Sequence, residues 1–97
     1  MITHIVLFKL KEPTPENVAA AREKLLSMRG RVPMLRHLEV GTDVVRSERS
    51  CDIALFTKFD SLADLQSYQT DPYHGGDVAP YMRLVSASVV SADYEAE

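Results

Sequence analysis

Two side chains capable of acid–base chemistry, Tyr68 and His74, flank an expected helix break at Asp71-Pro72. In an unbroken helix, residues six apart lie about 120° apart around the axis and cannot converge. Because the residue before a proline is disfavoured in the helical conformation, the break lets His74 fold back toward Tyr68. Histidine titrates near neutral pH and is the usual general base, and a tyrosine hydroxyl can hold a substrate oxygen. Tyr68 and His74 are therefore the candidate catalytic residues, although the spacing alone also fits a histidine on a surface loop.

A third candidate, His4, lies in an expected strand over residues 2–10. Side chains alternate along a strand, so His4 shares one face with Val6 and Phe8. The opposite face is apolar as well, so the strand needs cover on both sides. We expect His4, Val6 and Phe8 to line a small-molecule cavity together with Phe56. The alternative for His4 is a histidine at the edge of the core, satisfied by one hydrogen bond.

Other kinds of site lack the residues or the spacing that they need. Cys51 is the only cysteine, which excludes an intrachain disulfide and a cysteine-based zinc site. Asp71, His74 and Asp77 are spaced three apart, but Pro72 and the neighbouring glycines prevent a regular helix from aligning them on a metal ion. No glycine-rich phosphate loop follows a strand. We therefore expect neither a metal nor a cofactor.

The composition is that of one globular domain spanning residues 1–97. Hydrophobic residues make up 45% and charged residues 26% of the chain, so a modest core can form without disulfides. The formal net charge is −3 and no basic stripe is present, which argues against a nucleic-acid partner. The longest apolar run is far short of a membrane span, and Met1 leads straight into a strand instead of a signal peptide. We therefore expect a cytoplasmic protein with no membrane or nucleic-acid partner.

The expected elements follow the order strand, helix, strand, strand, helix, strand. Thr14 and Ser61 are expected helix N-caps, because such side chains accept hydrogen bonds from unpaired N–H groups of the first turn. Pro15 fits the first helical position. The segment 73–83 is expected to be mainly a loop, since it contains two glycines and a proline. The expected strands cover residues 2–10, 35–44, 51–59 and 84–94. The second strand is polar enough to lie at a sheet edge.

This order predicts an α+β fold, the ferredoxin-like βαββαβ sandwich with an antiparallel sheet. Right-handed crossovers place both helices on one face of that sheet. The other face is then bare, and its expected apolar residues are Ile2, Val6, Phe8, Leu10, Ala54, Phe56 and Val90. Such a patch is unusual on a monomer, so we expect a homodimer in which two bare faces close into an α/β barrel. His4 would lie inside that barrel, between the two subunits.

Over about residues 1–95 the chain resembles the stress-responsive α/β-barrel family, the Dabb domain. The resemblance is carried by segments 4–11 (HIVLFKLK), Pro33 with 38–41 (LEVG), 52–55 (DIAL) with 59–62 (FDSL), and 68–74 (YQTDPYH). The first and last of these segments are the more specific. The resemblance implies a dimeric barrel of ferredoxin-like domains, and most members of the family have no assigned activity.

The resemblance also implies roles for individual residues. A polyketide cyclase of this family uses a histidine and a tyrosine to close a linear polyketide by an intramolecular aldol reaction, and these match His74 and Tyr68. A further histidine that lines the cyclase cavity matches His4. This chain differs from the family and from its cyclase at two positions. The family often has histidine where Asp71 stands, and the first helix here lacks a tyrosine that the cyclase carries.

Three functions are compatible with the sequence. The preferred hypothesis is a stress-response type of dimer that binds a small apolar molecule in a cavity lined by histidine and tyrosine. The alternative is a polyketide-cyclase-like lyase in which His74 removes a proton next to a carbonyl while Tyr68 and His4 hold the substrate. The third is a cofactor-free monooxygenase like the antibiotic-biosynthesis monooxygenases, which share the fold and usually rely on cavity Asn, Trp or His residues. This chain has no Trp, and Asn17 is its only asparagine.

Overall fold

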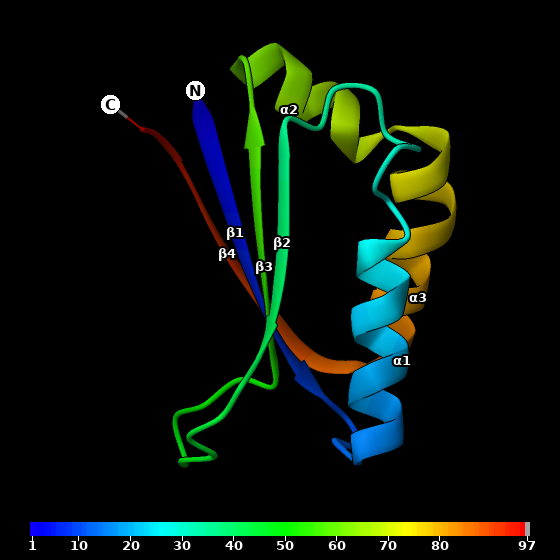
Figure 1. Cartoon of the computed structure of the whole chain (residues 1–97), viewed down its shortest axis with the longest axis vertical. Helices are drawn as coiled ribbons and strands as arrows, with labels where there is room; N and C mark the ends of the chain where they lie inside the picture. The colour runs from blue at the N-terminus through cyan, green and yellow to red at the C-terminus, as the bar shows by residue number, and fades with distance from the viewer. Residues whose placement is uncertain (97) are drawn as a thin grey trace.

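The computed structural model describes residues 1–96, which form one four-stranded sheet covered on one side by helices (Figure 1). The elements in chain order are β1 (Ile2–Leu10), α1 (Pro15–Leu26), β2 (His37–Thr42), β3 (Ile53–Phe59), α2 (Leu62–Gln69), the π-helical turn η1 (His74–Val78), α3 (Ala79–Val85) and β4 (Ser86–Glu95). The strand order is β2-β3-β1-β4, and every neighbouring pair is antiparallel. The predicted ferredoxin-like α+β fold is confirmed.

The two long helices begin where the sequence predicts. Thr14 caps α1, because its hydroxyl accepts the backbone N–H of Asn17 at 3.1 Å, and Pro15 occupies the first turn. Ser61 caps α2 in the same way through the N–H of Asp64, also at 3.1 Å. Each cap satisfies a backbone donor that has no partner within its helix. Both predicted caps are confirmed, and β2 lies at a sheet edge as expected.

The segment 73–83, expected to be mainly a loop, is helical for most of its length, so that prediction is wrong. It contains η1 and most of α3. Pro80 lies in the first turn of α3, where the N–H that proline lacks would have no partner within the helix. None of the helices within residues 1–96 is long and apolar enough to cross a membrane.

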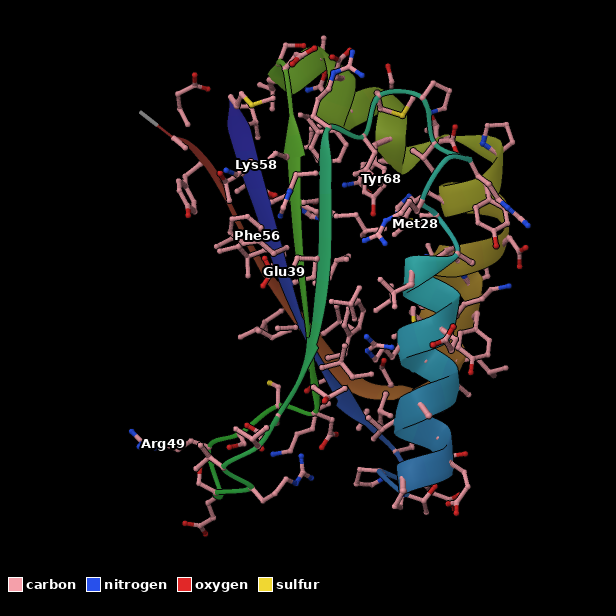
Figure 2. The ribbon with its side chains drawn as sticks, in the orientation of Figure 1. Met28, Glu39, Arg49, Phe56, Lys58 and Tyr68 are labelled. Carbon is pink, nitrogen blue, oxygen red and sulfur yellow. The ribbon has the colours of Figure 1, made fainter. Side chains whose placement is uncertain are left out.

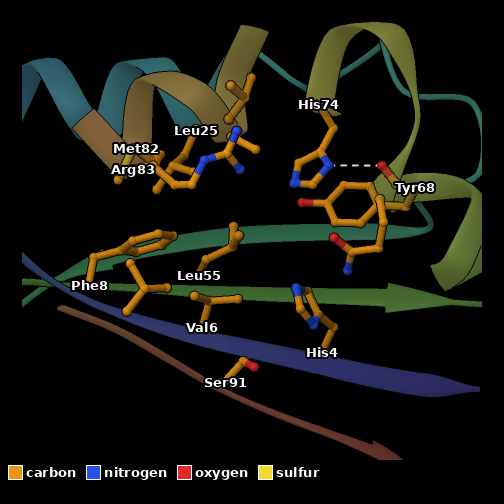
Figure 3. A pocket seen from close by; sticks show the side chains of 14 residues that line it. His4, Val6, Phe8, Leu25, Leu55, Tyr68, His74, Met82, Arg83 and Ser91 are labelled. Atoms are coloured by element: carbon orange, nitrogen blue, oxygen red, sulfur yellow. Dashed lines mark hydrogen bonds between the residues drawn. The ribbon is translucent and has the colours of Figure 1, made fainter. Parts of the chain in front are cut away.

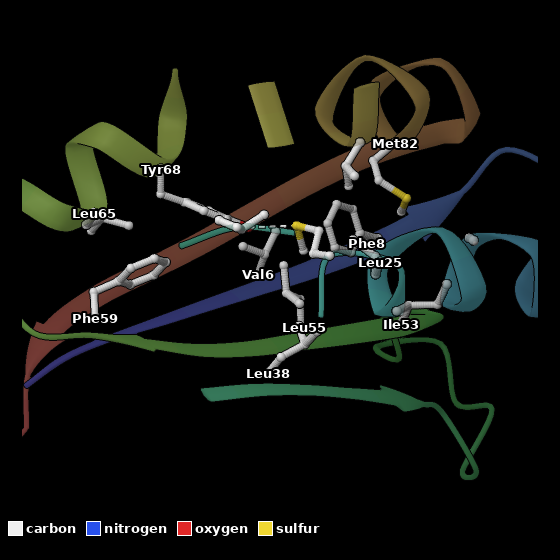
Figure 4. Close-up of a cluster of buried hydrophobic side chains, with 14 of the residues drawn as sticks. Val6, Phe8, Leu25, Leu38, Ile53, Leu55, Phe59, Leu65, Tyr68 and Met82 are labelled. Atoms are coloured by element: carbon white, nitrogen blue, oxygen red, sulfur yellow. Dashed lines mark hydrogen bonds between the residues drawn. The ribbon is translucent and has the colours of Figure 1, made fainter. Parts of the chain in front are cut away.

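The core fills the layer between the sheet and the helices (Figure 4). Leu25 of α1 and Tyr68 of α2 meet the strands there, and both are almost completely buried. The strands contribute Val6, Phe8, Leu38, Ile53, Leu55 and Phe59. Burying one such side chain stabilises the fold by about 1.5–3 kcal/mol. This layer therefore both holds the domain together and surrounds the predicted site residues.

The face of β1 that carries His4 packs under the helices and is not the bare face. His4, Val6 and Phe8 are 6%, 7% and 5% exposed in the single chain. The prediction that this face is uncovered, with His4 between two subunits, is therefore wrong. Alternation shows which residues share a face, but both faces of β1 are apolar, so the pattern cannot show which face the helices cover.

The bare face is also apolar, but it carries a different set of side chains. Leu7 is 37% exposed, Val90 56% and Tyr94 48%. The strand register adds Ile5, Ala54, Phe56 and Ala92 to this face. Figure 2 shows Phe56 on the side of the sheet away from the helices, whereas Tyr68 lies between the sheet and the helices. The apolar side that lacks a cover in the single chain is thus the Leu7 side of β1.

Candidate functional site

A pocket of about 330 Å³ lies between the sheet and the helices (Figure 3). The strands and the helices both contribute to its wall, which is mostly apolar and includes Val6, Phe8, Leu25, Leu55, Val78 and Met82. The rings of His4, Tyr68 and His74 gather at one end of it (Figure 3). A volume of this order is sufficient for a small organic ligand.

Tyr68 is the centre of the polar end of the pocket. Its ring is fully buried and stands edge-on to the ring of His4, with the two centroids 5.8 Å apart. Its hydroxyl donates to the Sδ of Met28 at 3.7 Å, and a thioether is a weak acceptor. Burial raises the pKa of Tyr68 far above its usual range, and the nearby charge of Asp71 adds to this effect. The hydroxyl therefore stays protonated at neutral pH and can donate a hydrogen bond to a ligand oxygen.

His74 stacks on Tyr68, with ring centroids 3.7 Å apart and ring planes inclined by 21°. Its Nδ1 lies 2.8 Å from the carbonyl oxygen of Tyr68 (dashed line in Figure 3). Because a carbonyl can only accept, Nδ1 carries the proton and Nε2 of the neutral ring keeps its lone pair. The Asp71 carboxylate accepts the backbone N–H groups of Tyr73 and His74, each at 3.0 Å, and so holds the turn that carries the ring.

The environment of His74 favours its neutral form. Burial lowers the pKa of His74 below its ordinary value near 6.5, and electrostatic interactions with His4 and Arg83 add to this effect. The hydrogen bond to Tyr68 and the charge of Asp71 oppose the shift without cancelling it. Since the folded-state pKa is depressed, the neutral ring stabilises the fold above about pH 6.5, and this contribution is lost as the pH falls through the lower value. At neutral pH, His74 is therefore an unprotonated base.

His4 is held by Asp93, a residue that the sequence analysis did not single out. The two residues are direct partners across β1 and β4, and Nδ1 of His4 hydrogen-bonds to the Asp93 carboxylate. A carboxylate behind an imidazole fixes the orientation of the ring and favours one tautomer. The alternation of side chains along the last strand shows which residues share a face with Asp93. Only the register between β1 and β4 identifies Asp93 as the partner of His4.

The structure brings five of the six predicted site residues together in this pocket: His4, Val6, Phe8, Tyr68 and His74. Phe56, the sixth, lies on the bare face, where its ring meets that of His37 edge-on at 5.6 Å. Its assignment to the cavity is wrong, because Phe56 pairs with Ile5 and therefore belongs to the other face of the sheet. The pocket is also formed within one chain, whereas the sequence predicted a cavity between two.

The acidic residues near His74 are engaged in contacts within the chain. Asp71 holds backbone N–H groups, and Asp77 accepts a hydrogen bond from the Nζ of Lys24 at 2.7 Å. Within the residues that the structure describes, no three His, Cys, Asp or Glu side chains lie close enough together to hold a metal ion. The chemistry that the described site itself offers is that of proton transfer and hydrogen bonding.

Comparison with protein families gives a match over nearly the whole chain. The model of the Stress responsive A/B Barrel Domain, Dabb, matches residues 2–96. The chain belongs to the Dabb family. The predicted resemblance is thus confirmed, while the comparison with curated proteins finds no match.

Solved structures share the fold of this Dabb domain. A dimeric ferredoxin-like protein of unknown function from Bacteroides fragilis NCTC 9343 is 29% identical, with a TM-score of 0.82 over 98% of this chain and 95% of that one. A hydroxynitrile lyase from Passiflora edulis is 17% identical, with a TM-score of 0.84 over 99% and 93%. An antibiotic biosynthesis monooxygenase is 13% identical, with a TM-score of 0.73 over 100% and 99%. The last two likenesses show the fold alone.

The position of His74 in this Dabb domain depends on Gly75, which the sequence analysis treated as a loop signal. A Cβ on Gly75 would lie 2.6 Å from the carbonyl oxygen of Gln69 and 3.4 Å from backbone carbons of Thr70. The N–H of Gly75 also donates to the Asp71 carbonyl at 2.6 Å. A side chain here would collide with backbone, so glycine is what lets η1 pack on the end of α2.

We predict that Gly75→Ala displaces His74 from Tyr68 and destabilises the domain by about 1–3 kcal/mol, the usual cost of forcing atoms into packed space. Urea unfolding measures the loss of stability, and the NMR signals of the His74 ring report the loss of stacking. Gly76→Ala is the matched control, because nothing lies within 4 Å of a Cβ at that position. Equal effects in both variants, or an unchanged His74 signal in Gly75→Ala, would contradict this role of Gly75.

Proposed function

We propose that this Dabb domain binds a small, mainly apolar molecule in the pocket between its sheet and its helices. The observation that carries the proposal is the wall of the pocket, where aliphatic and aromatic side chains surround about 330 Å³ and polar rings gather at one end. Ligand sites typically combine an apolar wall with a few placed polar groups. The weak hydrogen bond from Tyr68 to Met28 adds support, because a ligand oxygen would be a better acceptor than the thioether.

We predict that apolar acids and polyketide-like compounds raise the melting temperature of the protein, since a ligand that binds only the folded state stabilises it. Val89→Trp should weaken each hit at least tenfold, because Val89 lines the pocket and is 46% exposed, so the larger ring can occupy the cavity without straining the core. Val44→Trp is the control, as Val44 is 89% exposed and does not line the pocket. No shift with any compound, or equal binding by Val89→Trp, would contradict the proposal.

A second function, acid–base catalysis on the bound molecule, is favoured by the geometry of His74. Its Nδ1 is tied to the Tyr68 carbonyl, so Nε2 is the atom that can accept a proton. Burial keeps the ring neutral by lowering its pKa, and the hydroxyl of Tyr68 beside it stays protonated. A base and a hydrogen-bond donor thus lie next to each other at the same end of the pocket.

In this reaction, Nε2 of His74 removes a proton from a carbon next to a ligand carbonyl, and the C–H electron pair forms an enolate. The hydroxyl of Tyr68 donates a hydrogen bond to the enolate oxygen. The enolate carbon then attacks a second carbonyl of the same molecule, and His74 returns its proton to the new alkoxide. The product is a cyclic aldol, formed without an oxidant or a reductant.

We predict that His74→Gln slows the exchange of the α-protons of a pocket-sized β-diketone, such as nonane-2,4-dione, into D₂O by about 10²–10⁴-fold. For the unaltered protein, the rate measured by proton NMR should fall with a midpoint below pH 6.5, because burial lowers the pKa of His74. His37→Gln should keep the original rate, since His37 is exposed on β2 outside the pocket. An unchanged rate in His74→Gln, or a midpoint above pH 6.5, would count against catalysis by His74.

The third hypothesis from the sequence, a cofactor-free monooxygenase, has less support. The likeness to an antibiotic biosynthesis monooxygenase is a likeness of fold, at 13% identity. Asn17, the only asparagine, lies in the first turn of α1, where its side chain donates to the Glu12 carbonyl at 2.9 Å. The geometry therefore favours ligand binding and proton transfer over oxygenation.

We infer that two copies of the chain pair through the bare face of the sheet, the face that carries Leu7. The exposed apolar side chains there would be protected from water by a second copy. Solved structures of the same fold from Bacteroides fragilis and Thermobifida fusca are described as dimeric, which supports the inference. In such a pair, the two sheets close into a barrel, and each pocket stays under the helices of its own chain.

We predict that the protein sediments at twice its chain mass of 10.9 kDa and that Leu7→Lys shifts it toward the single-chain mass. The charge would have to be buried unpaired in the interface. Leu84→Lys is the control, because Leu84 is 70% exposed on α3, on the opposite side of the sheet. A single-chain mass for the unaltered protein at tens of micromolar, or equal behaviour of the two variants, would contradict the inferred dimer.

A further inference from the structure

Arg83 lies at the mouth of the pocket without a partner for its charge. It belongs to α3, its side chain is exposed, and it lines the cavity beside Met82. Figure 3 shows it on the same side of the cavity as His74. Within residues 1–96, the guanidinium makes no ion pair and no side-chain hydrogen bond. It is therefore free to pair with a group on a ligand.

The acidic residues around the pocket are already engaged. Asp93 pairs with His4, Asp71 accepts two backbone N–H groups, and Asp77 pairs with Lys24. The 14 residues that line the pocket include no Asp, Glu or Lys, so Arg83 is the one permanent charge among them. A neutral ligand would leave this charge facing an apolar cavity, whereas an anionic ligand would complement it.

Most other arginines of the described chain have partners. Arg22, Arg36 and Arg46 each pair with a carboxylate, and Arg29 donates to a backbone carbonyl. Arg49 resembles Arg83 in having no ion pair, but it lies between β2 and β3, outside this pocket. Arg49 lines a different pocket, and that pocket also contains the acidic residue Asp43. What distinguishes Arg83 is thus an unpaired charge at an apolar cavity whose wall contains no acidic residue.

We propose that the ligand of this pocket is an apolar carboxylic acid whose carboxylate pairs with Arg83. The hydrocarbon part lies against the apolar wall that includes Phe8, Leu25 and Leu55. A guanidinium offers two parallel N–H donors that match the two oxygens of a carboxylate. A single arginine suits a singly charged carboxylate better than a phosphate dianion. This inference names the ligand class of the proposed binding function and rests on it.

The test compares ligands that share one hydrocarbon chain and differ in the head group. We expect calorimetric titration of the full-length protein to show that octanoate binds about fivefold to tenfold more tightly than 1-octanol, as expected for a partly exposed guanidinium–carboxylate pair. Octylamine should bind more weakly than the alcohol. The advantage of octanoate should shrink as salt is added, because salt screens exposed charges.

Variants of Arg83 show whether this residue is the source of the preference. Arg83→Gln should remove the advantage of octanoate and leave the affinity for 1-octanol within about twofold. Arg83→Lys should keep part of the advantage, since it retains the charge but loses the planar pair of donors. Arg49→Gln makes the same change of net charge outside the pocket and should bind octanoate like the unaltered protein.

The outcomes separate this inference from the function on which it rests. Equal binding of octanoate and 1-octanol would overturn the role of Arg83 and leave apolar ligand binding intact. An equal loss of octanoate binding in Arg49→Gln would also overturn it, as the effect would then come from net charge alone. Tighter binding of octyl phosphate than of octanoate would overturn the choice of a carboxylate. Binding of none of these probes would contradict both the inference and the proposed function.

Discussion

The acid–base chemistry proposed for this Dabb domain depends on one hydrogen bond, from Nδ1 of His74 to the carbonyl oxygen of Tyr68. Carbonyls in the last turn of a helix have no partner within the helix, and α2 ends one residue after Tyr68. The imidazole binds there and thereby fixes its own tautomer, which leaves Nε2 as the basic atom. The bond exists because Asp71 holds the turn and Gly75 lets the next helical turn approach the end of α2.

Tyr68 joins three segments that are far apart in the sequence. His74 stacks on its ring from the turn that follows α2, and His4 meets the ring edge-on from β1, where Asp93 of β4 orients it. The same burial acts on the tyrosine and on His74 in opposite directions, because desolvation always disfavours the charged form. It raises the pKa of Tyr68 and lowers that of His74. A neutral donor therefore lies beside a neutral acceptor, in surroundings where hydrogen bonds are stronger than in water.

Local sequence signals predicted the local structure, and their failures have physical causes. The hydroxyls of Thr14 and Ser61 mark helix starts because a cap is a contact within a few residues. The helical segment that begins at His74 was missed because its glycine and proline were taken as signs of a loop. Both residues are compatible with a helix at their positions: Gly75 allows a close backbone contact, and Pro80 lies in the first turn of α3. Phe56 was placed in the cavity because strand alternation gives two faces but does not say which one the helices cover.

The pocket proposed to bind a ligand and the surface inferred to form the dimer lie on opposite faces of the sheet. In β1, the even-numbered residues His4, Val6 and Phe8 line the pocket, while the odd-numbered Ile5 and Leu7 lie on the bare face. The polar end of the pocket is complete within one chain, so a second copy is not needed to supply a reacting group. A partner sheet would instead bury the reverse side of the strand that carries His4. Because that strand is central and hydrogen-bonded on both edges, packing on its second face would fix the position of His4 without altering the wall of the pocket.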